Sequence, residues 1–293
     1  MPLDRKRLHK PFRKLRKNLK TFPRQPSPDL VHDVRTSSRR IEAIVAALAL
    51  DSKPGVKRLL RSLNRVRKQA GKLRDMDVLT GFASPLKVDQ EQDCVVQLVE
   101  FLGSQRYKKA AKMQAIVREQ APTLRRRLQL CSKRVEKFVG KDESQQPNRT
   151  APAEVTGLAL RLSSELQRPP RLTRSTLHPY RLQVKQLQYV LQLAGDQPPE
   201  QQRFVEKLKQ VKDAIGEWHD WQELLSIAGK VLDHGGNCRV LQELKSICDH
   251  KFEHALVVTN EMRMQYLNFR RDGEIRGKRL PEPVLAAATV AAA

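Results

Sequence analysis

The stretch LVHDVRTSSRRIEAIVAALAL, residues 30–50, places three basic or imidazole side chains three and four residues apart. In an α-helix, at about 100° per residue, His32, Arg35 and Arg39 fall within about 60° of one another. The apolar residues gather on the opposite side: Val34, Ile41, Val45 and Leu48. Like charges one turn apart repel each other by roughly 0.2–0.5 kcal/mol. The pattern therefore predicts a helix with one buried face and a narrow cationic face that an anion would stabilise.

The composition of the whole chain agrees with an anionic partner. Among 293 residues, 56 are Lys or Arg and 32 are Asp or Glu, which gives a formal net charge of +24. A chain this basic attracts polyanions, so nucleic acid, anionic lipid and polyphosphate are the partner classes to weigh. Aromatic residues make up only 5% of the chain. This low share argues against a single-stranded nucleic acid, because such partners are usually bound by base stacking.

Targeting and membrane-spanning patterns are not found in this sequence. Residues 1–20 lack the apolar core of a secretory signal, and no run approaches about 18 apolar residues. The cysteines are far apart and form no CxxC motif: Cys94, Cys131, Cys238 and Cys248. Isolated thiols of this kind fit a reducing compartment. We therefore expect a cytoplasmic protein without a membrane segment.

Nearly every segment has the apolar spacing of an amphipathic helix and none alternates like a strand, so we predict an all-α fold. The predicted helices span residues 3–22, 28–50, 55–82, 89–114, 123–139, 153–168, 175–195, 199–233 and 238–268. Ser27 and Pro28 form a typical helix start, and Pro122 is expected to begin a new helix. The polar segment GKDESQQPNRTAP, residues 140–152, is predicted to be a linker, and residues 271–293 are expected to be a disordered tail.

The two sides of the predicted linker resemble each other. VHDVRTSSRRIEAIV, residues 31–45, aligns with LHPYRLQVKQLQYVL, residues 177–191. The aligned pairs are His32 with His178, Arg35 with Arg181, and Arg39 with Lys185. Apolar residues recur at the same positions of both segments. The match predicts an internal duplication, with a first repeat at residues 1–139 and a second at residues 153–270.

A second pair of segments extends the match. Residues 59–79 align with residues 204–224 after a shift of one residue. The aligned pairs are Arg67 with Lys212, Gly71 with Gly216, and Arg74 with His219. These basic and imidazole groups flank the apolar face of their helix, so they lie at the edge of a core, where a ligand between helices would reach them. The alternative is that they form ion pairs with nearby acids such as Asp75, Asp77 and Asp220.

These motifs resemble the CHAD family (conserved histidine α-helical domain). The resemblance is carried by VHDVRTSSRR (31–40), GKLRDMDVL (71–79) and LHPYRLQVKQLQY (177–189) with the later IGEWHDW (215–221), and it extends over about residues 5–268. It implies two homologous helical bundles related by a pseudo-two-fold axis, with a basic groove between them that binds inorganic polyphosphate. The residues that it assigns to this groove are His32, Arg35, Arg39, Arg40, Arg67, Arg74, His178, Arg181, Lys185, Lys212 and His219.

The chemistry of these residues suits a phosphate chain. Such a chain offers about one negative charge per unit and no base edges, and the planar fork of arginine binds two of its oxygens at once. Histidine donates a hydrogen bond and adds charge when protonated. Gln186 and His219 depart from the family's pattern, so the second repeat is expected to bind less strongly than the first.

The residues alone leave two alternative function classes. Nucleic acid fits the charge, and weak non-specific binding at low salt is expected, but no helix-turn-helix, zinc-finger or RNP pattern is present. A metal-dependent phosphohydrolase would use His-Asp dipeptides, which occur at residues 32–33 and 219–220. The repeat keeps neither dipeptide, so this reading is the less favoured one.

The sequence therefore predicts a protein that binds inorganic polyphosphate, catalyses no reaction and needs no metal or other cofactor. The resemblance further implies an association with polyphosphate granules in the cytoplasm.

Overall fold

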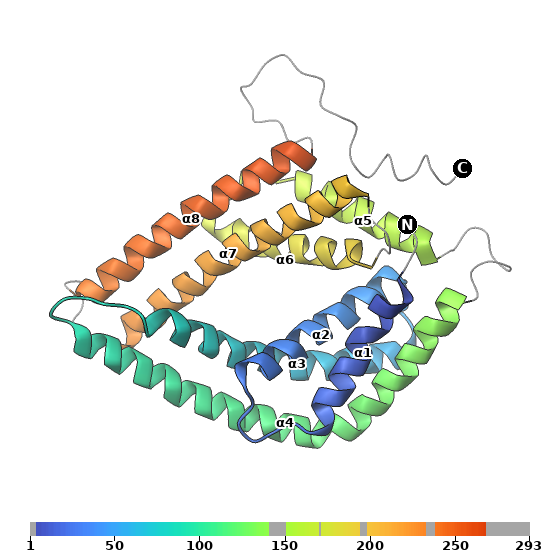
Figure 1. The fold of residues 1–293 in the computed structure, drawn as a ribbon, viewed down its shortest axis with the longest axis horizontal. Helices are drawn as coiled ribbons and strands as arrows, with labels where there is room; N and C mark the ends of the chain where they lie inside the picture. Colours follow the sequence, from blue (N-terminus) through green and yellow to red (C-terminus); the bar gives the residue numbers. More distant parts are fainter. Residues whose placement is uncertain (1–3, 141–150, 170, 194–197, 233–237, 268–293) are drawn as a thin grey trace, which may run out of the picture. The chain divides into compact units, whose positions relative to one another are not determined.

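A computed structural model of the chain describes residues 4–140, 151–169, 171–193, 198–232 and 238–267. Within these ranges the chain forms α-helices and no strands, which confirms the all-α prediction (Figure 1). The helices are α1 (Arg5–Lys20), α2 (Pro28–Ala47), α3 (Pro54–Ala83), α4 (Gln92–Gly140), α5 (Ala151–Gln167), α6 (Arg174–Leu191), α7 (Pro199–Val231) and α8 (Arg239–Tyr266). Most of the predicted linker and the whole of the predicted tail lie outside the described residues.

The starts of α2 and α6 follow from capping residues in the sequence. The Ser27 side chain accepts a hydrogen bond from the backbone N–H of Leu30 at 3.2 Å, and Pro28 occupies the first turn of α2, as predicted. At the start of α6, Thr173 and Thr176 form a reciprocal capping box. These caps fix where α2 and α6 begin, and thereby the register of their basic residues.

The predicted break at Pro122 is wrong. Residues 89–114 and 123–139 were expected to be separate helices, but α4 runs through Pro122 as one long helix (Figure 1). An interior proline costs about 3 kcal/mol. Leu124 and Leu128, two and six residues further on, are completely buried, and burial of each contributes roughly 1.5–3 kcal/mol. Packing of the helix beyond the proline therefore outweighs the local penalty.

The chain divides into two compact units. The N-terminal unit consists of residues 5–147 and 220–248, and the C-terminal unit consists of residues 1–4, 148–219 and 249–293. The division of the sequence into repeats at residues 1–139 and 153–270 stays a prediction. By their contacts, the end of α7 and the beginning of α8 group with the N-terminal unit.

The physical reason is an apolar cluster inside the N-terminal unit. In this unit α1 packs on α2 and α4, and α3 packs on α2 and α4. Beyond residue 220, α7 and α8 add buried apolar side chains against the end of α3 and the start of α4: Trp221, Leu224, Ala228, Leu232, Cys238, Val240 and Leu244. The Trp221 ring stacks on Phe82 of α3 with 4.6 Å between ring centroids and an interplanar angle of 7°. Burial of an indole ring dominates such local packing.

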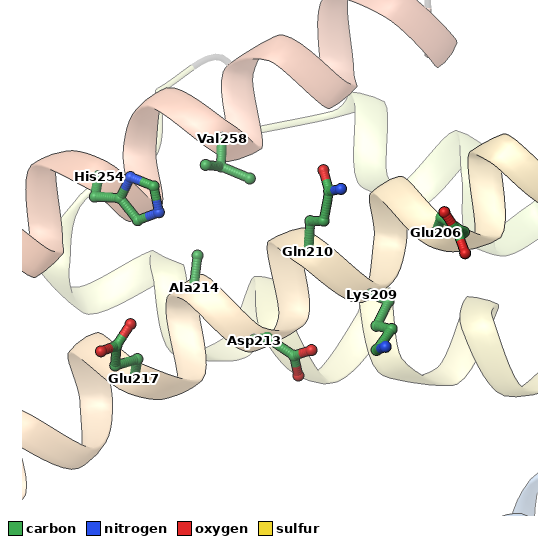
Figure 2. A pocket seen from close by; sticks show the side chains of 8 residues that line it. All are labelled: Glu206, Lys209, Gln210, Asp213, Ala214, Glu217, His254 and Val258. Atoms are coloured by element: carbon green, nitrogen blue, oxygen red, sulfur yellow. The ribbon is translucent and has the colours of Figure 1, made fainter. Parts of the chain in front are cut away.

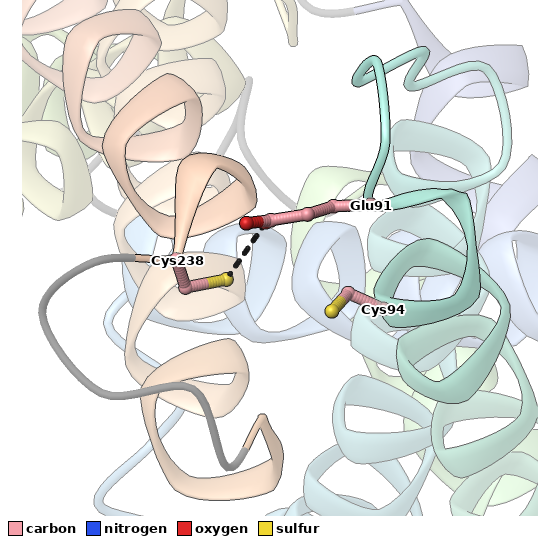
Figure 3. Close-up of side chains that lie close together, drawn as sticks. All are labelled: Glu91, Cys94 and Cys238. Carbon is pink, nitrogen blue, oxygen red and sulfur yellow. Dashed lines mark hydrogen bonds between the residues drawn. The ribbon is translucent and has the colours of Figure 1, made fainter.

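The carboxylate of Glu91, which precedes α4, lies at the start of α8 (Figure 3). One Glu91 oxygen accepts a hydrogen bond from the backbone N–H of Val240 at 3.1 Å and from the Cys238 thiol at 3.3 Å. An acidic side chain at this position stabilises a helix N-terminus by capping it and by favourable interaction with its dipole. Glu91 therefore ties α8 to the N-terminal unit.

In the C-terminal unit, α5 packs on α6, and α7 packs on α8 through aromatic pairs. The guanidinium of Arg263 on α8 is completely buried; it donates hydrogen bonds to the backbone oxygens of Gln167 and Pro169 and lies 5.8 Å from the Tyr180 ring centroid. Burial raises the pKa of the Tyr180 hydroxyl. Arg263 thus holds the end of α5 by structural contacts, and we assign it no role in binding.

None of the described helices combines the length and the apolar character that a membrane span requires.

Candidate functional site

The predicted basic face of α2 is present in the N-terminal unit. The apolar side chains of the opposite face are completely buried: Val34, Ile41, Val45 and Leu48. On the other side, His32 and Arg40 are exposed, and Arg35 and Arg39 are partly buried. The helical period therefore predicted correctly which side of α2 faces the core.

His32 lies in a strongly positive environment. Partial burial of its ring is the main cause that lowers the pKa of His32 below its usual value, and the positive charge of Arg74 is the next. Arg35 and Lys14 lower this pKa further, whereas Asp33 acts in the opposite direction. His32 is therefore predominantly neutral near pH 7 and becomes a better proton acceptor when an anion compensates the surrounding charge.

Arg74 on α3 does not form the ion pairs that were its alternative explanation. Asp77, one of the acids considered, instead accepts a hydrogen bond from Arg106 at 2.7 Å, and its side chain is only 3% exposed. Within the described part of the chain the Arg74 guanidinium has neither a hydrogen bond nor an ion pair. Its charge is available to His32 and to a ligand.

Arg67 behaves differently from Arg74. Its Nε donates to Glu42 at 2.9 Å, and its Nη2 donates to Asn64 at 2.7 Å. Both contacts are partly buried. A guanidinium held by two partners is explained by the local structure alone, so the structure supports the ion-pair alternative for this residue.

In the C-terminal unit, α6 and α7 bring together the two predicted histidines. The rings of His178 and His219 lie 4.3 Å apart between centroids, with an interplanar angle of 32°. Together they offer ring nitrogens both as donors and as acceptors.

The side chain of Arg181, one turn after His178 on α6, extends to α7. Its Nε donates to the backbone oxygen of Lys212 at 3.0 Å. Its guanidinium lies directly over Gly216: a Cβ atom built on this glycine would be 2.9 Å from Cζ and Nε of Arg181. Only glycine leaves this space, which gives a physical reason for Gly216 in the middle of a helix.

The remaining predicted residues of the C-terminal unit are more constrained. The Nζ atom of Lys212 lies 3.1 Å from an exposed carboxylate oxygen of Asp213. Lys185 is buried, with 6% of its surface exposed. Lys185 therefore contacts its neighbours within the unit rather than projecting into solvent.

Two relations between aligned residues recur in both units. The charge of Arg74 acts on His32, and the ring of His178 lies against that of His219; these are aligned pairs in the sequence repeat. The Nε of Arg35 would lie 3.7 Å from a Cβ on Gly71, as Arg181 lies over the aligned glycine of α7. The recurrence agrees with the repeat alignment. The pseudo-two-fold axis and the groove between bundles stay predictions, because each unit is described by itself.

A cavity of about 690 Å³ among the described residues does not contain the predicted site (Figure 2). It lies between α7 and α8 of the C-terminal unit. Its charged side chains are mostly acidic: Glu206, Asp213 and Glu217, against Lys209 and His254. Such a lining repels a polyanion. This cavity is therefore not the predicted polyanion site.

The side chains that could ligate a metal ion lie apart from the predicted site residues. Among the described residues, the group of His, Cys, Asp and Glu side chains with metal-like spacing is Glu91, Cys94 and Cys238 (Figure 3). Glu91 caps α8 there, and burial is the main cause that raises the pKa of the Cys94 thiol. Asp33 of the first His-Asp dipeptide pairs with Lys14 at 2.6 Å. The described His-Asp dipeptides thus do not converge on a metal-like cluster.

Lys14 of α1 was not among the predicted site residues. Its charge reaches His32, and its ion pair with Asp33 joins α1 to the start of α2. The basic amino-terminal segment was the signal, but the helical pattern alone does not reveal which of its lysines faces α2.

The comparisons with known proteins identify the family and the fold. The CHAD domain model matches residues 6–227. The chain belongs to the CHAD family. A crystal structure of the CHAD domain from the plant Ricinus communis has a similar fold, with a TM-score of 0.63 and 15% sequence identity over 92% of this chain and 91% of that chain. At this identity the likeness establishes the fold alone. A comparison with curated proteins found no significant match.

Proposed function

We propose that this CHAD protein binds inorganic polyphosphate through the basic residues of α2 and α3 and those of α6 and α7, without catalysing a reaction. The observation that carries the proposal is a recurring arrangement of basic groups. In one unit His32 lies in the field of Arg74, and in the other the His178 ring lies against the aligned residue, His219. In both units an arginine one turn after the histidine lies at a glycine of the next helix. The family resemblance, which implies polyphosphate as the ligand, supports the same choice.

The charge balance around His32 explains why the ligand should be an anion with many charges. Arg35, Arg40 and Arg74 have no ion-pair partner among the described residues. Charge-assisted hydrogen bonds from arginine to phosphate oxygens contribute roughly 1.5–3 kcal/mol each. A flexible phosphate chain can satisfy several of these groups in succession, which a single small anion cannot do.

A triple variant tests the assignment. Arg35, Arg40 and Arg74 would each be replaced by Gln, which removes three charges but breaks no described ion pair. The matched control replaces Lys10, Arg13 and Lys17 of α1, which are exposed, and has the same net charge. Long-chain polyphosphate binding, measured near physiological salt, should weaken by at least about 100-fold in the first variant, or about 2.7 kcal/mol. The control should change it only about two- to threefold. Equal losses would contradict the site assignment, because diffuse charge would then explain binding.

Nucleic acid is the second candidate function, favoured by the net charge of +24. A direct competition between long-chain polyphosphate and single-stranded RNA distinguishes the two. We expect polyphosphate to win by at least about tenfold, or about 1.4 kcal/mol. Equal affinities would indicate a general polyanion binder.

The absence of catalysis is part of the proposal and has its own test. Purified protein incubated with polyphosphate and divalent metal ions should release no phosphate above a protein-free control. Steady phosphate release would instead favour the metal-dependent phosphohydrolase reading. Association with polyphosphate granules, the finer localisation that the family implies, is testable by imaging a fluorescent fusion in cells that accumulate polyphosphate.

A further inference from the structure

The N-terminal unit contains a second basic cavity that the repeat alignment does not include. It has a volume of about 360 Å³ and lies between the first turn of α3 and the second half of α4. Four arginines line it, together with the hydroxyl of Thr123 and the thiol of Cys131; the arginines are Arg58, Arg126, Arg127 and Arg134. No acidic side chain belongs to the lining.

Three of the four guanidinium groups of this cavity have no bonded partner among the residues that the structure describes. The guanidinium groups of Arg58, Arg126 and Arg134 have neither a hydrogen bond nor an ion pair with any described residue. By contrast, Arg106 and Arg174 each pair with a carboxylate. Like charges gathered without a counter-charge repel one another, so an anion between them would be stabilised.

Two contacts hold arginine side chains of this cavity in defined positions. The Nη1 atom of Arg127 donates to the Ser62 hydroxyl at 2.5 Å, which fixes its direction. The guanidinium of Arg134 lies over Gly55: a Cβ atom on that glycine would be 2.6 Å from Nη1 and 3.3 Å from Cζ of Arg134. The absence of a side chain at Gly55 thus gives Arg134 its position.

The position of Arg134 is electrostatically unfavourable in the unliganded protein. Gly55 belongs to the first turn of α3, whose N-cap residue Lys53 makes no capping hydrogen bond with its side chain. A helix N-terminus carries partial positive charge, so a cation there is destabilising and an anion is favoured. Burial also raises the pKa of the Cys131 thiol to about 11, so this side chain stays neutral and supplies no counter-charge.

We propose that this cavity binds an oxoanion of the phosphate type, held by Arg58, Arg126 and Arg134 and oriented by Arg127. It is separate from the residues around His32, because Gly55 and Gly71 lie sixteen residues apart on α3, which is about 24 Å at 1.5 Å per residue. The proposal does not depend on the function proposed above. The phosphate group is either free inorganic phosphate or one segment of a longer phosphate chain.

The test measures phosphate binding by isothermal titration calorimetry on the full chain. Inorganic phosphate, pyrophosphate and tripolyphosphate serve as probes of increasing charge. A double variant, R126Q/R134Q, removes two exposed arginines without a described partner and should weaken phosphate binding at least about tenfold. The control, K108Q/K112Q, has the same net charge and changes exposed residues further back on α4. It should change the affinity less than about twofold.

Gly55→Ala provides a test at constant charge. The added methyl group displaces the flexible end of Arg134, and alanine favours a helix over glycine, so the protein should fold normally. Phosphate affinity should fall about three- to tenfold. In the R35Q/R40Q/R74Q background, where the phosphate contacts around His32 are removed, Gly55→Ala should still lower the remaining phosphate affinity by the same factor, which separates this cavity from the His32 residues. Saturable binding that is lost equally in the K108Q/K112Q control, or no saturable binding at all, would overturn the proposal.

Long-chain polyphosphate distinguishes the two sources of the phosphate group. If the cavity takes a segment of a chain, R126Q/R134Q should also weaken binding of the long polymer. If it takes free phosphate, polymer binding should be unchanged while phosphate binding is lost. Both results support an oxoanion site, and each names its ligand.

Discussion

Replacement of Gly216 by alanine should destabilise the C-terminal unit, although alanine is the better helix former. The new Cβ atom would lie 2.9 Å from both Cζ and Nε of Arg181, so the guanidinium must move. Its hydrogen bond to the Lys212 backbone oxygen, 3.0 Å long, would then be lost or distorted. The aligned glycine of α3, Gly71, is the matched control, because its Cβ would meet Arg35 Nε at 3.7 Å, an ordinary van der Waals contact.

The magnitudes decide the sign of each effect. A hydrogen bond from a charged group contributes about 1.5–3 kcal/mol, and a glycine-to-alanine change in a helix interior contributes about 1 kcal/mol in the opposite direction. Gly216→Ala should therefore lower the free energy of unfolding by about 0.5–2 kcal/mol. Gly71→Ala, which loses no hydrogen bond, should raise it by up to about 1 kcal/mol.

Calorimetric and guanidinium unfolding of both variants would measure these changes. A loss of 1 kcal/mol corresponds to about 2–4 °C in Tm for 150–250 residues and to about 4–8 °C for 60–100 residues, so a unit of intermediate size should shift by a few degrees. In an R181Q background the penalty at position 216 should disappear, since no guanidinium then lies over the residue. If Gly216→Ala stabilises the protein as much as Gly71→Ala does, the contact between Arg181 and Gly216 has no energetic significance and the reasoning fails.

Two further predictions concern the N-terminal unit. Replacing Arg74 by Gln should raise the pKa of His32 toward its usual value, because one positive charge that lowers it is removed; NMR titration of the ring measures this. Added polyphosphate should raise the same pKa in the wild type, so polyphosphate affinity should increase as pH falls below the usual histidine range. A His32 titration that is unchanged in both experiments would refute the electrostatic interaction. Replacing Glu91 by Ala should lower the free energy of unfolding by about 1–2 kcal/mol, because the α8 cap is lost. The control, Glu100→Ala on the exposed side of α4, should change it by less than about 0.5 kcal/mol. Equal effects of the two substitutions would show that Glu91 does not act as a cap.

The helices and their inward faces could be predicted from the sequence because they depend on local information. The spacing of Val34, Ile41 and Val45 predicts the buried side of α2, and Ser27 predicts its start. The failure at Pro122 has a different origin. A local rule assigns a break there, but the burial of Leu124 and Leu128 depends on helices far away in the chain.

The grouping of the chain into units depended on similar long-range contacts. The repeat alignment ends near residue 224, and nothing in the local pattern of α7 indicates that Trp221 would stack on Phe82. The ion pair between Arg67 and Glu42 joins residues 25 positions apart on neighbouring helices. This ion pair forms because α2 is rotated about its axis so that Glu42 faces α3. No single sequence motif specifies that rotation.

The contrast between Arg67 and Lys212 refines which residues a phosphate chain would engage. These two residues are aligned in the repeat, and each contacts an acid. Asp213 is well exposed, and a pair of this kind contributes only about 0–1 kcal/mol, so a phosphate can take its place at little cost. Arg67 is held by two partly buried partners, and its transfer to a ligand would leave Glu42 without a counter-charge. A polyanion should therefore bind His32, Arg35 and Arg74 while Arg67 keeps its internal partners. In the C-terminal unit, Lys212 stays available as a ligand-binding residue.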